Sequence, residues 1–275
     1  MRTSILRRYS WLLVLLLGGG LFKLDEQTLV HTGDPNYVPS VVLIGAAVVP
    51  IAFVAFVYGR RLPYDVPTSV VVATALVGGI IGTVVAGIWE FETLRRFGFL
   101  PTVGIAVIEE LSKLLTPLLI LIVLPYRRTA DGLLLGVASG AGFAALETMG
   151  YGFVVLLRSG GNIGATAHLL FLRGVLSPAA HMAWTGITAA ALFACWEDRW
   201  RFRSIIRFVI VLGIAITLHA LWDGVGNLHD YVYLAGAGLV VLGWVTHRAA
   251  RDVPPIDAYA DPQVHAGRRG LVRPA

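Results

Sequence analysis

The stretch DGLLLGVASGAGFAALETMGYGFVVLL, residues 131–157, indicates the class of this protein. Its only charged residues are Asp131 and Glu147, and it is longer than the roughly 20 residues that a helix needs to cross the hydrocarbon of a bilayer. Small residues recur at every fourth position and so line one stripe of the predicted helix: Gly132, Gly136, Gly140 and Ala144. Such stripes let helix backbones approach closely in lipid. The stretch therefore predicts a transmembrane helix packed against a neighbour.

Apolar runs of this kind recur along most of the chain. The sequence is 56% hydrophobic and only 14% charged, with a mean hydropathy of +0.74, whereas a soluble domain is about one quarter charged. The other predicted spans are residues 9–22, 39–58, 68–89, 102–124, 177–196, 205–225 and 231–247. The span 68–89 carries a second stripe of small residues, Gly78, Gly82 and Ala86. Barrel strands would alternate between polar and apolar residues. We therefore predict an all-α, polytopic transmembrane helix bundle with about eight spans.

Lysine and arginine are divided unevenly between alternate connections. One set holds Arg2, Arg7, Arg8, Arg60, Arg61, Arg127, Arg128, Arg199, Arg201, Arg203, Arg207, Arg248 and Arg251, and the other holds only Lys23, Arg95, Arg96, Arg158 and Arg173. Cytoplasmic loops carry the excess of such residues. The sequence thus predicts a multi-pass protein of the cell membrane with both termini in the cytoplasm, whose first span is an uncleaved signal anchor.

The charge and the cysteine content exclude some classes. The net charge is +5 and the isoelectric point is about 9.6, but the basic residues lie between apolar runs, where they set orientation and contact the headgroups of the lipid bilayer. We therefore predict no nucleic-acid partner. A single cysteine, Cys195, allows neither an intrachain disulfide nor a cysteine metal cluster.

Seven of the ionisable residues inside predicted spans are candidate site residues. They are Glu109, Glu110 and Lys113 in residues 102–124, Glu147 in residues 131–157, His181 in residues 177–196, and His219 and Asp223 in residues 205–225. An unpaired charge in hydrocarbon costs about 2.5–3.5 kcal/mol or more, so such residues indicate a functional site that faces the bundle interior. From the rise of about 1.5 Å per residue along a helix, we place the ionisable residues of all four spans in the outer half of the bilayer. Asp131, at a span end, is interpreted as solvated.

Helical spacing suggests partners within this group. Lys113 is four residues from Glu109 and three from Glu110, so it can pair with either. Adjacent glutamates diverge by about 100° around a helix, so their roles must differ. The spacing of His219 and Asp223 lets the carboxylate orient the imidazole.

Two chemistries fit these residue types. In the first, His181, His219 and a carboxylate bind zinc, and a remaining glutamate acts as general base. In the second, a glutamate activates water without a metal, and the histidines stabilise the oxyanion. The residue types leave both open.

The motifs resemble those of one known family. Glu109-Glu110-Leu-Ser-Lys113 is similar to the Glu-Glu-x-x-Lys signature of the PrsW family of intramembrane metalloproteases, and Phe143-x-x-x-Glu147 to its second motif. His181 and His219, the latter followed by Asp223, are similar to the later motifs. The resemblance covers residues 100–225 in the right order. The family is similar to the CaaX prenyl proteases and bacteriocin-processing proteins.

The resemblance implies an intramembrane peptidase, a hydrolase of peptide bonds that is usually classed as a metalloprotease. The catalytic residues would be Glu109, Glu110, Lys113, Glu147, His181, His219 and Asp223, with Zn²⁺ bound by Glu147, His181 and His219. It also implies a membrane-anchored protein substrate, such as an anti-sigma factor, that is cut near the outer face.

The predicted organisation has three parts. Residues 1–98 hold three N-terminal spans, residues 99–250 form a PrsW-like catalytic bundle of five spans, and residues 251–275, rich in Pro, Asp, Arg and Gly, form a disordered cytoplasmic tail. The segment 162–174 is apolar but too short to cross.

Two other functions use the same residues. Buried Glu and His side chains could form the relay of a proton-coupled transporter, although the sequence shows no inverted repeat. A non-catalytic membrane scaffold would keep the cluster closed to water.

Overall fold

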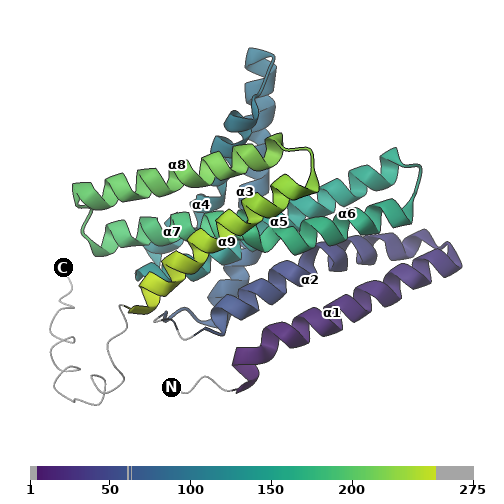
Figure 1. Ribbon diagram of the computed structural model, residues 1–275, viewed down its shortest axis with the longest axis horizontal. Helices are drawn as coiled ribbons and strands as arrows, with labels where there is room; N and C mark the ends of the chain where they lie inside the picture. The colour runs from purple at the N-terminus through teal and green to yellow at the C-terminus, as the bar shows by residue number, and fades with distance from the viewer. Residues whose placement is uncertain (1–4, 61, 63, 252–275) are drawn as a thin grey trace.

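The computed structural model describes residues 5–60, 62 and 64–251, and these residues fold into helices with no strand among them (Figure 1). The predicted disordered tail lies outside the described residues except for Arg251. The α-helices are α1 (Ile5–Thr32), α2 (Val38–Tyr58), α3 (Thr68–Phe97), α4 (Thr102–Val123), α5 (Thr129–Arg158), α6 (Ile163–Leu176), α7 (His181–Glu197), α8 (Phe202–Gly224) and α9 (Leu228–Arg251), with single 3₁₀ turns η1 (Pro35–Tyr37) and η2 (Ser177–Ala179).

The helices have the length and composition of a membrane protein. Six stretches of the described chain are long and apolar enough to cross a bilayer: Pro35–Tyr58, Thr68–Phe97, Thr129–Arg158, Ile163–Glu197, Phe202–Gly224 and Leu228–Arg248. The other two predicted spans correspond to α1 and α4. Helix α4 carries three charged residues, and it packs against α3, α5, α7 and α8, so protein encloses its charged face. The prediction of an all-α polytopic bundle is confirmed.

Two helices extend beyond their apolar runs. Helix α3 continues past residue 89 to Phe97, and its last turns carry an ion pair of 2.7 Å between Glu92 and Arg95. Gly98 then ends the helix in the left-handed conformation that favours glycine, at φ +74°. Helix α1 continues past residue 22 to Thr32, through a 2.7 Å pair between Lys23 and Glu26. Pairs at this spacing support a helix where the apolar pattern stops.

The segment that looked too short to cross is the first half of a broken span. Helix α6 leads through η2 directly into α7, and the two helices follow one another across the molecule (Figure 1). Pro178 has no N–H for a helix ladder, and Ala180 has non-helical angles of φ −104° and ψ −113°. Because protein surrounds the break, with Ala180 only 1% exposed, the irregular backbone is tolerated at membrane depth. His181 is therefore the first residue of α7.

The glycine stripe of α5 brings α7 into close contact. A Cβ atom built at Gly140 would lie 2.6 Å from the carbonyl oxygen of His181, and one at Gly132 would lie 2.7 Å from that of Ala189. On α3, a Cβ at Gly78 would lie 2.6 Å from Oγ of Ser139, so this stripe also faces α5. Both stripes are helix contacts, as the sequence predicts.

Asp131 is buried, so its interpretation as a solvated residue is wrong. Its side chain accepts hydrogen bonds from the backbone N–H groups of Asp65 and Arg128, each at 3.0 Å. The residue is 1% exposed. It caps the start of α5 and ties this helix to the connection before α3.

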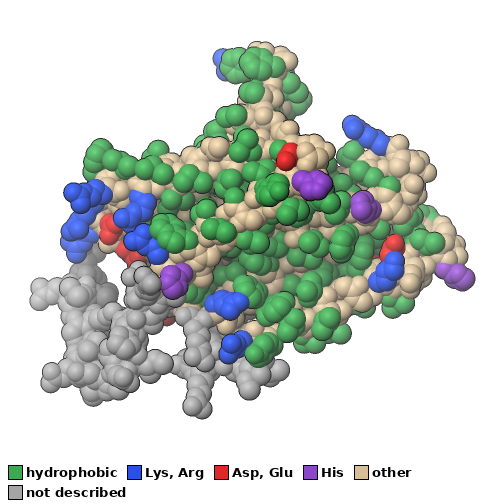
Figure 2. Space-filling view, viewed as in Figure 1, with side chains coloured by type: hydrophobic (Ala, Val, Ile, Leu, Met, Phe, Trp, Pro, Cys, Tyr) green, Lys and Arg blue, Asp and Glu red, His purple; other side chains and the backbone are tan. Residues whose placement is uncertain are grey.

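The outer surface is largely apolar. Figure 2 shows hydrophobic side chains over most of the middle of one face, with Lys and Arg side chains mainly toward its edges. Leu16 is 71% exposed and Val240 is 72% exposed. Exposed apolar side chains on this scale suit contact with lipid.

Candidate functional site

Four helices bring the predicted residues together in the interior of the bundle. Helix α4 supplies Glu109, Glu110 and Lys113, α5 supplies Glu147, α7 supplies His181, and α8 supplies His219 and Asp223. Ion pairs of 3.5 Å or less and a hydrogen bond between Lys113 and His181 link all seven into one network, which we call the acid–imidazole cluster.

Lys113 is at the centre of the acid–imidazole cluster. Its side chain is fully buried, and Nζ lies 2.8 Å from Oε1 of Glu110 and 3.1 Å from Oε2 of Glu109. Nζ also lies 2.8 Å from Nδ1 of His181 and 4.3 Å from the ring centre of Phe143. The sequence left open which glutamate pairs with Lys113, and both do. The ammonium, which has no exposed surface, therefore compensates charge on both glutamates.

The two glutamates differ in what else they contact. Nδ1 of His219 lies 2.8 Å from Oε1 of Glu110, whose side chain is fully buried. Nε2 of the same ring lies 3.5 Å from Oε2 of Glu109 and 3.4 Å from Asp223. Trp184 stacks on the imidazole with ring centres 5.0 Å apart. His219 is thus held by Glu110 and Trp184, while its Nε2 faces Glu109.

His181 lies between Lys113 and Glu147. An ammonium group only donates hydrogen bonds, so Nδ1 of His181 accepts from Lys113. The proton of the neutral ring is then on Nε2, which lies 3.0 Å from Oε2 of Glu147. This arrangement fixes both the tautomer and the orientation of the ring.

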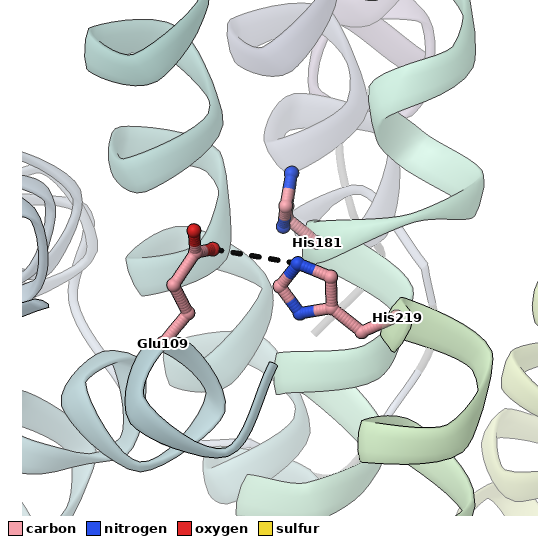
Figure 3. A group of neighbouring side chains, drawn as sticks. All are labelled: Glu109, His181 and His219. Atoms are coloured by element: carbon pink, nitrogen blue, oxygen red, sulfur yellow. Dashed lines mark ion pairs between the residues drawn. The ribbon is translucent and has the colours of Figure 1, made fainter. Parts of the chain in front are cut away.

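Glu109, His181 and His219 form a group that could hold a metal ion. Each offers one ligand atom, and these atoms lie within 4.8 Å of one another. Figure 3 shows Glu109 and His219 pointing toward one another from separate helices, with His181 beside them. Two imidazoles and one carboxylate match the usual three protein ligands of catalytic zinc. The predicted set differs in one member, because Glu147 contacts His181 but is not in this group.

The charges of the acid–imidazole cluster also fit a divalent cation. Oε2 of Glu109 and Oε2 of Glu110 are buried and have no hydrogen-bond partner among the described residues. Asp223 is exposed, and the other three carboxylates of the cluster face two nearby cations, Lys113 and Arg173. With neutral imidazoles this leaves one excess negative charge in the interior, and burying it is costly unless a cation compensates it. The residues present therefore suit a metal such as Zn²⁺.

Two cavities are lined in part by residues of the acid–imidazole cluster. One, of about 450 Å³, is lined by residues of α3, α4 and α5, including Glu90, Glu109 and Glu147. The other, of about 350 Å³, is lined by residues including His181 and Arg173. Tyr151 lines both. A hydrolytic reaction needs such space for water and substrate beside its reactive groups.

The sequence did not single out two charged residues beside these cavities. Arg173 was counted in a loop, but it belongs to α6 and lies 2.8 Å from Glu147. Glu90 was placed after the end of a span, but it belongs to α3 and lines the larger cavity. If the predicted helices had extended further along the chain, both residues would have been charged residues inside apolar helices, which indicates a functional site.

The fold and the acid–imidazole cluster define a polytopic α-helical membrane protein with a buried, cavity-linked centre of carboxylates and imidazoles. The family model described as PrsW family intramembrane metalloprotease matches residues 66–247, and the chain belongs to this family. No curated protein and no solved structure matches it.

Proposed function

We propose that the protein is a metal-dependent intramembrane peptidase that cuts a membrane-anchored protein near the outer face of the membrane. The observation that carries this proposal is the position of Oε2 of Glu109, which is buried and makes ionic contacts with Lys113 and His219 but no hydrogen bond among the described residues. It faces His219 across 3.5 Å, and Glu109 lines an open cavity. A carboxylate in this setting has the geometry for hydrolytic chemistry.

Glu109, His181 and His219 would hold the metal, which we propose to be Zn²⁺. His181 would bind it through Nδ1 in place of the hydrogen bond from Lys113, because the ring proton is on Nε2. Bound there, the ion would polarise the scissile carbonyl group and lower the pKa of water. Glu110 orients His219 through Nδ1, as carboxylates beside metal-bound histidines do. Asp223 lies near the other side of the same ring. Lys113 compensates the charge of both glutamates.

Glu147 is better placed as a proton acceptor than as a metal ligand. Its contacts with His181 and Arg173 both use Oε2, at 3.0 and 2.8 Å. No ion pair among the described residues uses Oε1, and Glu147 lines the larger cavity. Oε1 can therefore take a proton from water in that cavity and pass it to the leaving amine.

The substrate we propose is a membrane protein with an apolar segment, of the anti-sigma-factor kind that the family resemblance implies. A third cavity, of about 890 Å³, is lined mainly by apolar side chains of α2, α3 and α5 and shares Leu146 with the 450 Å³ cavity beside Glu109. An apolar segment would be shielded from water there. The proposed outer side rests on the distribution of Lys and Arg. Arg173 lies in α6, which leaves even fewer basic residues on that side.

Cleavage by the purified protein tests this proposal. The protein in proteoliposomes would be mixed with a single-span substrate, and the products identified by mass spectrometry. Glu109→Gln and His219→Asn should abolish cleavage. The matched controls are Glu92→Gln, an exposed residue of α3 paired with Arg95, and His168→Asn, an exposed residue of α6. Both should cleave normally. Normal cleavage by Glu109→Gln and His219→Asn would overturn the proposal, as would proton-coupled solute flux without proteolysis.

A further inference from the structure

Helix α6 contributes a cation to the acid–imidazole cluster. The guanidinium of Arg173 lies 2.8 Å from Oε2 of Glu147. The same carboxylate oxygen lies 3.0 Å from Nε2 of His181. The side chain of Arg173 is 24% exposed, and that of Glu147 is 20% exposed. Glu147 therefore has two partners, one from each half of the broken span.

Neighbours on α5 fix the direction of the Arg173 side chain. Its Nε donates a hydrogen bond of 3.3 Å to Oγ1 of Thr148. The guanidinium also lies over the ring of Tyr151, 4.1 Å from the ring centre. Planar guanidinium groups combine such contacts with aromatic faces and carboxylates, and a lysine ammonium group does not reproduce this geometry. Arg173 is thus fixed by a carboxylate, a hydroxyl and an aromatic ring.

We infer that Arg173 is a positioning residue for this centre, and the inference rests on the proposed function. Arg173 holds the Glu147 carboxylate against Nε2 of His181. It leaves Oε1 of Glu147 as the proton acceptor on the side of the 450 Å³ cavity. It acts through Glu147 and does not contact the reacting atoms.

The contacts that run from Lys113 through His181 and Glu147 to Arg173 support the positioning role. Lys113 donates to Nδ1 of His181, and the ring proton on Nε2 faces Glu147. A carboxylate held by the imidazole alone could rotate about its side-chain torsions, since terminal carboxylate torsions are broad. Arg173 restricts that rotation from the opposite side. The cationic groups of Lys113 and Arg173 thus fix the histidine and the glutamate as a pair.

A direct role in substrate binding is a poorer fit to these contacts. The cationic group already contacts Glu147, Thr148 and Tyr151. A substrate carboxylate would have to displace Glu147. A substrate-binding role predicts a raised KM, whereas a positioning role predicts a lowered kcat.

Kinetics of two Arg173 variants separate these roles. Arg173→Gln should lower kcat by about 10- to 100-fold, the range typical of residues that orient others at metal centres, with KM unchanged. Arg173→Lys should restore part of the loss. The control is Arg158→Gln, an exposed residue at the end of α5, which should behave as wild type. A raised KM with a normal kcat would overturn the inference, as would normal values of both.

A double-mutant cycle shows whether Arg173 acts through Glu147. In a Glu147→Gln background, Arg173→Gln should cause little further loss, because the carboxylate that it positions is gone. Full additivity of the two losses would overturn the inference. Thermal unfolding of each variant in detergent reveals a purely structural role, because a large loss of thermal stability would then explain the loss of activity.

A measurement without turnover separates this inference from the proposed function. ¹⁵N NMR of histidine-labelled protein, with the His181 signal assigned through His181→Asn, should show the Nε2-protonated tautomer in the wild type. Arg173→Gln should shift that signal, and Arg158→Gln should not. A wild-type protein that never cleaves would contradict the proposed function. An unchanged His181 signal in Arg173→Gln would contradict the positioning role alone.

Discussion

Nδ1 of His219 lies 2.8 Å from Oε1 of Glu110, a side chain with no exposed surface. This contact leaves Nε2 of the ring available toward Glu109. Removing the charge at Glu110 should weaken metal binding, because carboxylates behind metal-bound histidines typically contribute 10- to 100-fold in affinity. We expect Glu110→Gln to bind zinc about that much more weakly, in a competition titration with a chelator. An unchanged affinity would contradict this, and Glu92→Gln is the control.

The metal content of two glutamate variants distinguishes the alternative ligand sets. Glu109 groups with His181 and His219, whereas Glu147 contacts only His181 of these two. We therefore expect purified Glu109→Gln to lose its bound zinc and Glu147→Gln to retain it while cleaving more slowly. Elemental analysis of both proteins checks this. Zinc lost from Glu147→Gln but kept in Glu109→Gln would favour the set predicted from the sequence.

Lys113 should matter for stability as well as for chemistry. It is fully buried beside two carboxylates, and removing one partner of a buried ion pair costs about 3–5 kcal/mol. Lys113→Met should therefore lower the temperature of unfolding in detergent. Lys23→Met is the matched control, because Lys23 is 62% exposed in its pair with Glu26 and exposed pairs contribute less than about 1 kcal/mol. Equal unfolding temperatures for Lys113→Met and the wild type would contradict the proposed pairing.

Both the transmembrane helices and the seven residues of the acid–imidazole cluster could be predicted from the apolar character of the sequence. Charges are rare in apolar runs, so each one is visible. The sequence could not say which carboxylate faces the imidazoles. That depends on how α4 and α5 are rotated and crossed, and side-chain spacing along one helix does not determine the rotation of another. From the sequence, Glu109 and Glu147 were therefore equally good candidates for the carboxylate that joins the two imidazoles. In the structure, Glu109 groups with both histidines and Glu147 contacts only His181.

The environment of three other residues, Arg173, Glu90 and Asp131, was wrongly predicted from the sequence for a second reason. Each lies near the end of an apolar run, where the composition changes but the helix continues or begins. Arg173 was assigned to a loop because α6 alone is too short to cross, and only its continuation into α7 makes one span. The ends of apolar runs are poor guides to helix ends in this chain.

Asp131 should stabilise the start of α5. Its carboxylate accepts hydrogen bonds from the backbone of Asp65 and Arg128. Asp131→Ala removes both hydrogen bonds, each of which contributes about 0.5–1.5 kcal/mol. We expect a lower unfolding temperature in detergent, with Asp198→Ala as the control because Asp198 is exposed. Asp131→Ala with wild-type stability would show that water satisfies these groups.

Gly140 should control the position of His181. A Cβ atom there would lie 2.6 Å from the carbonyl oxygen of His181 and 3.0 Å from Cα of Met182, both at the start of α7. Backbone atoms cannot swing aside as a flexible side chain can, so Gly140→Leu must push the first turn of α7 away from α5. Overpacking of this kind costs about 1–3 kcal/mol. We expect a lower unfolding temperature and a loss of cleavage.

The matched control for Gly140 is Gly213→Ala in α8, where a Cβ atom would meet nothing within 4 Å. Alanine is favoured over glycine inside a helix by about 1 kcal/mol, so this variant should be as stable as the wild type or more so. Retained cleavage and normal zinc content in Gly140→Leu would contradict the prediction. They would mean that α7 can shift while His181 still reaches Lys113 and Glu147. A zinc content that falls together with the cleavage rate would instead show that the contact between α5 and α7 sets the geometry of the metal group.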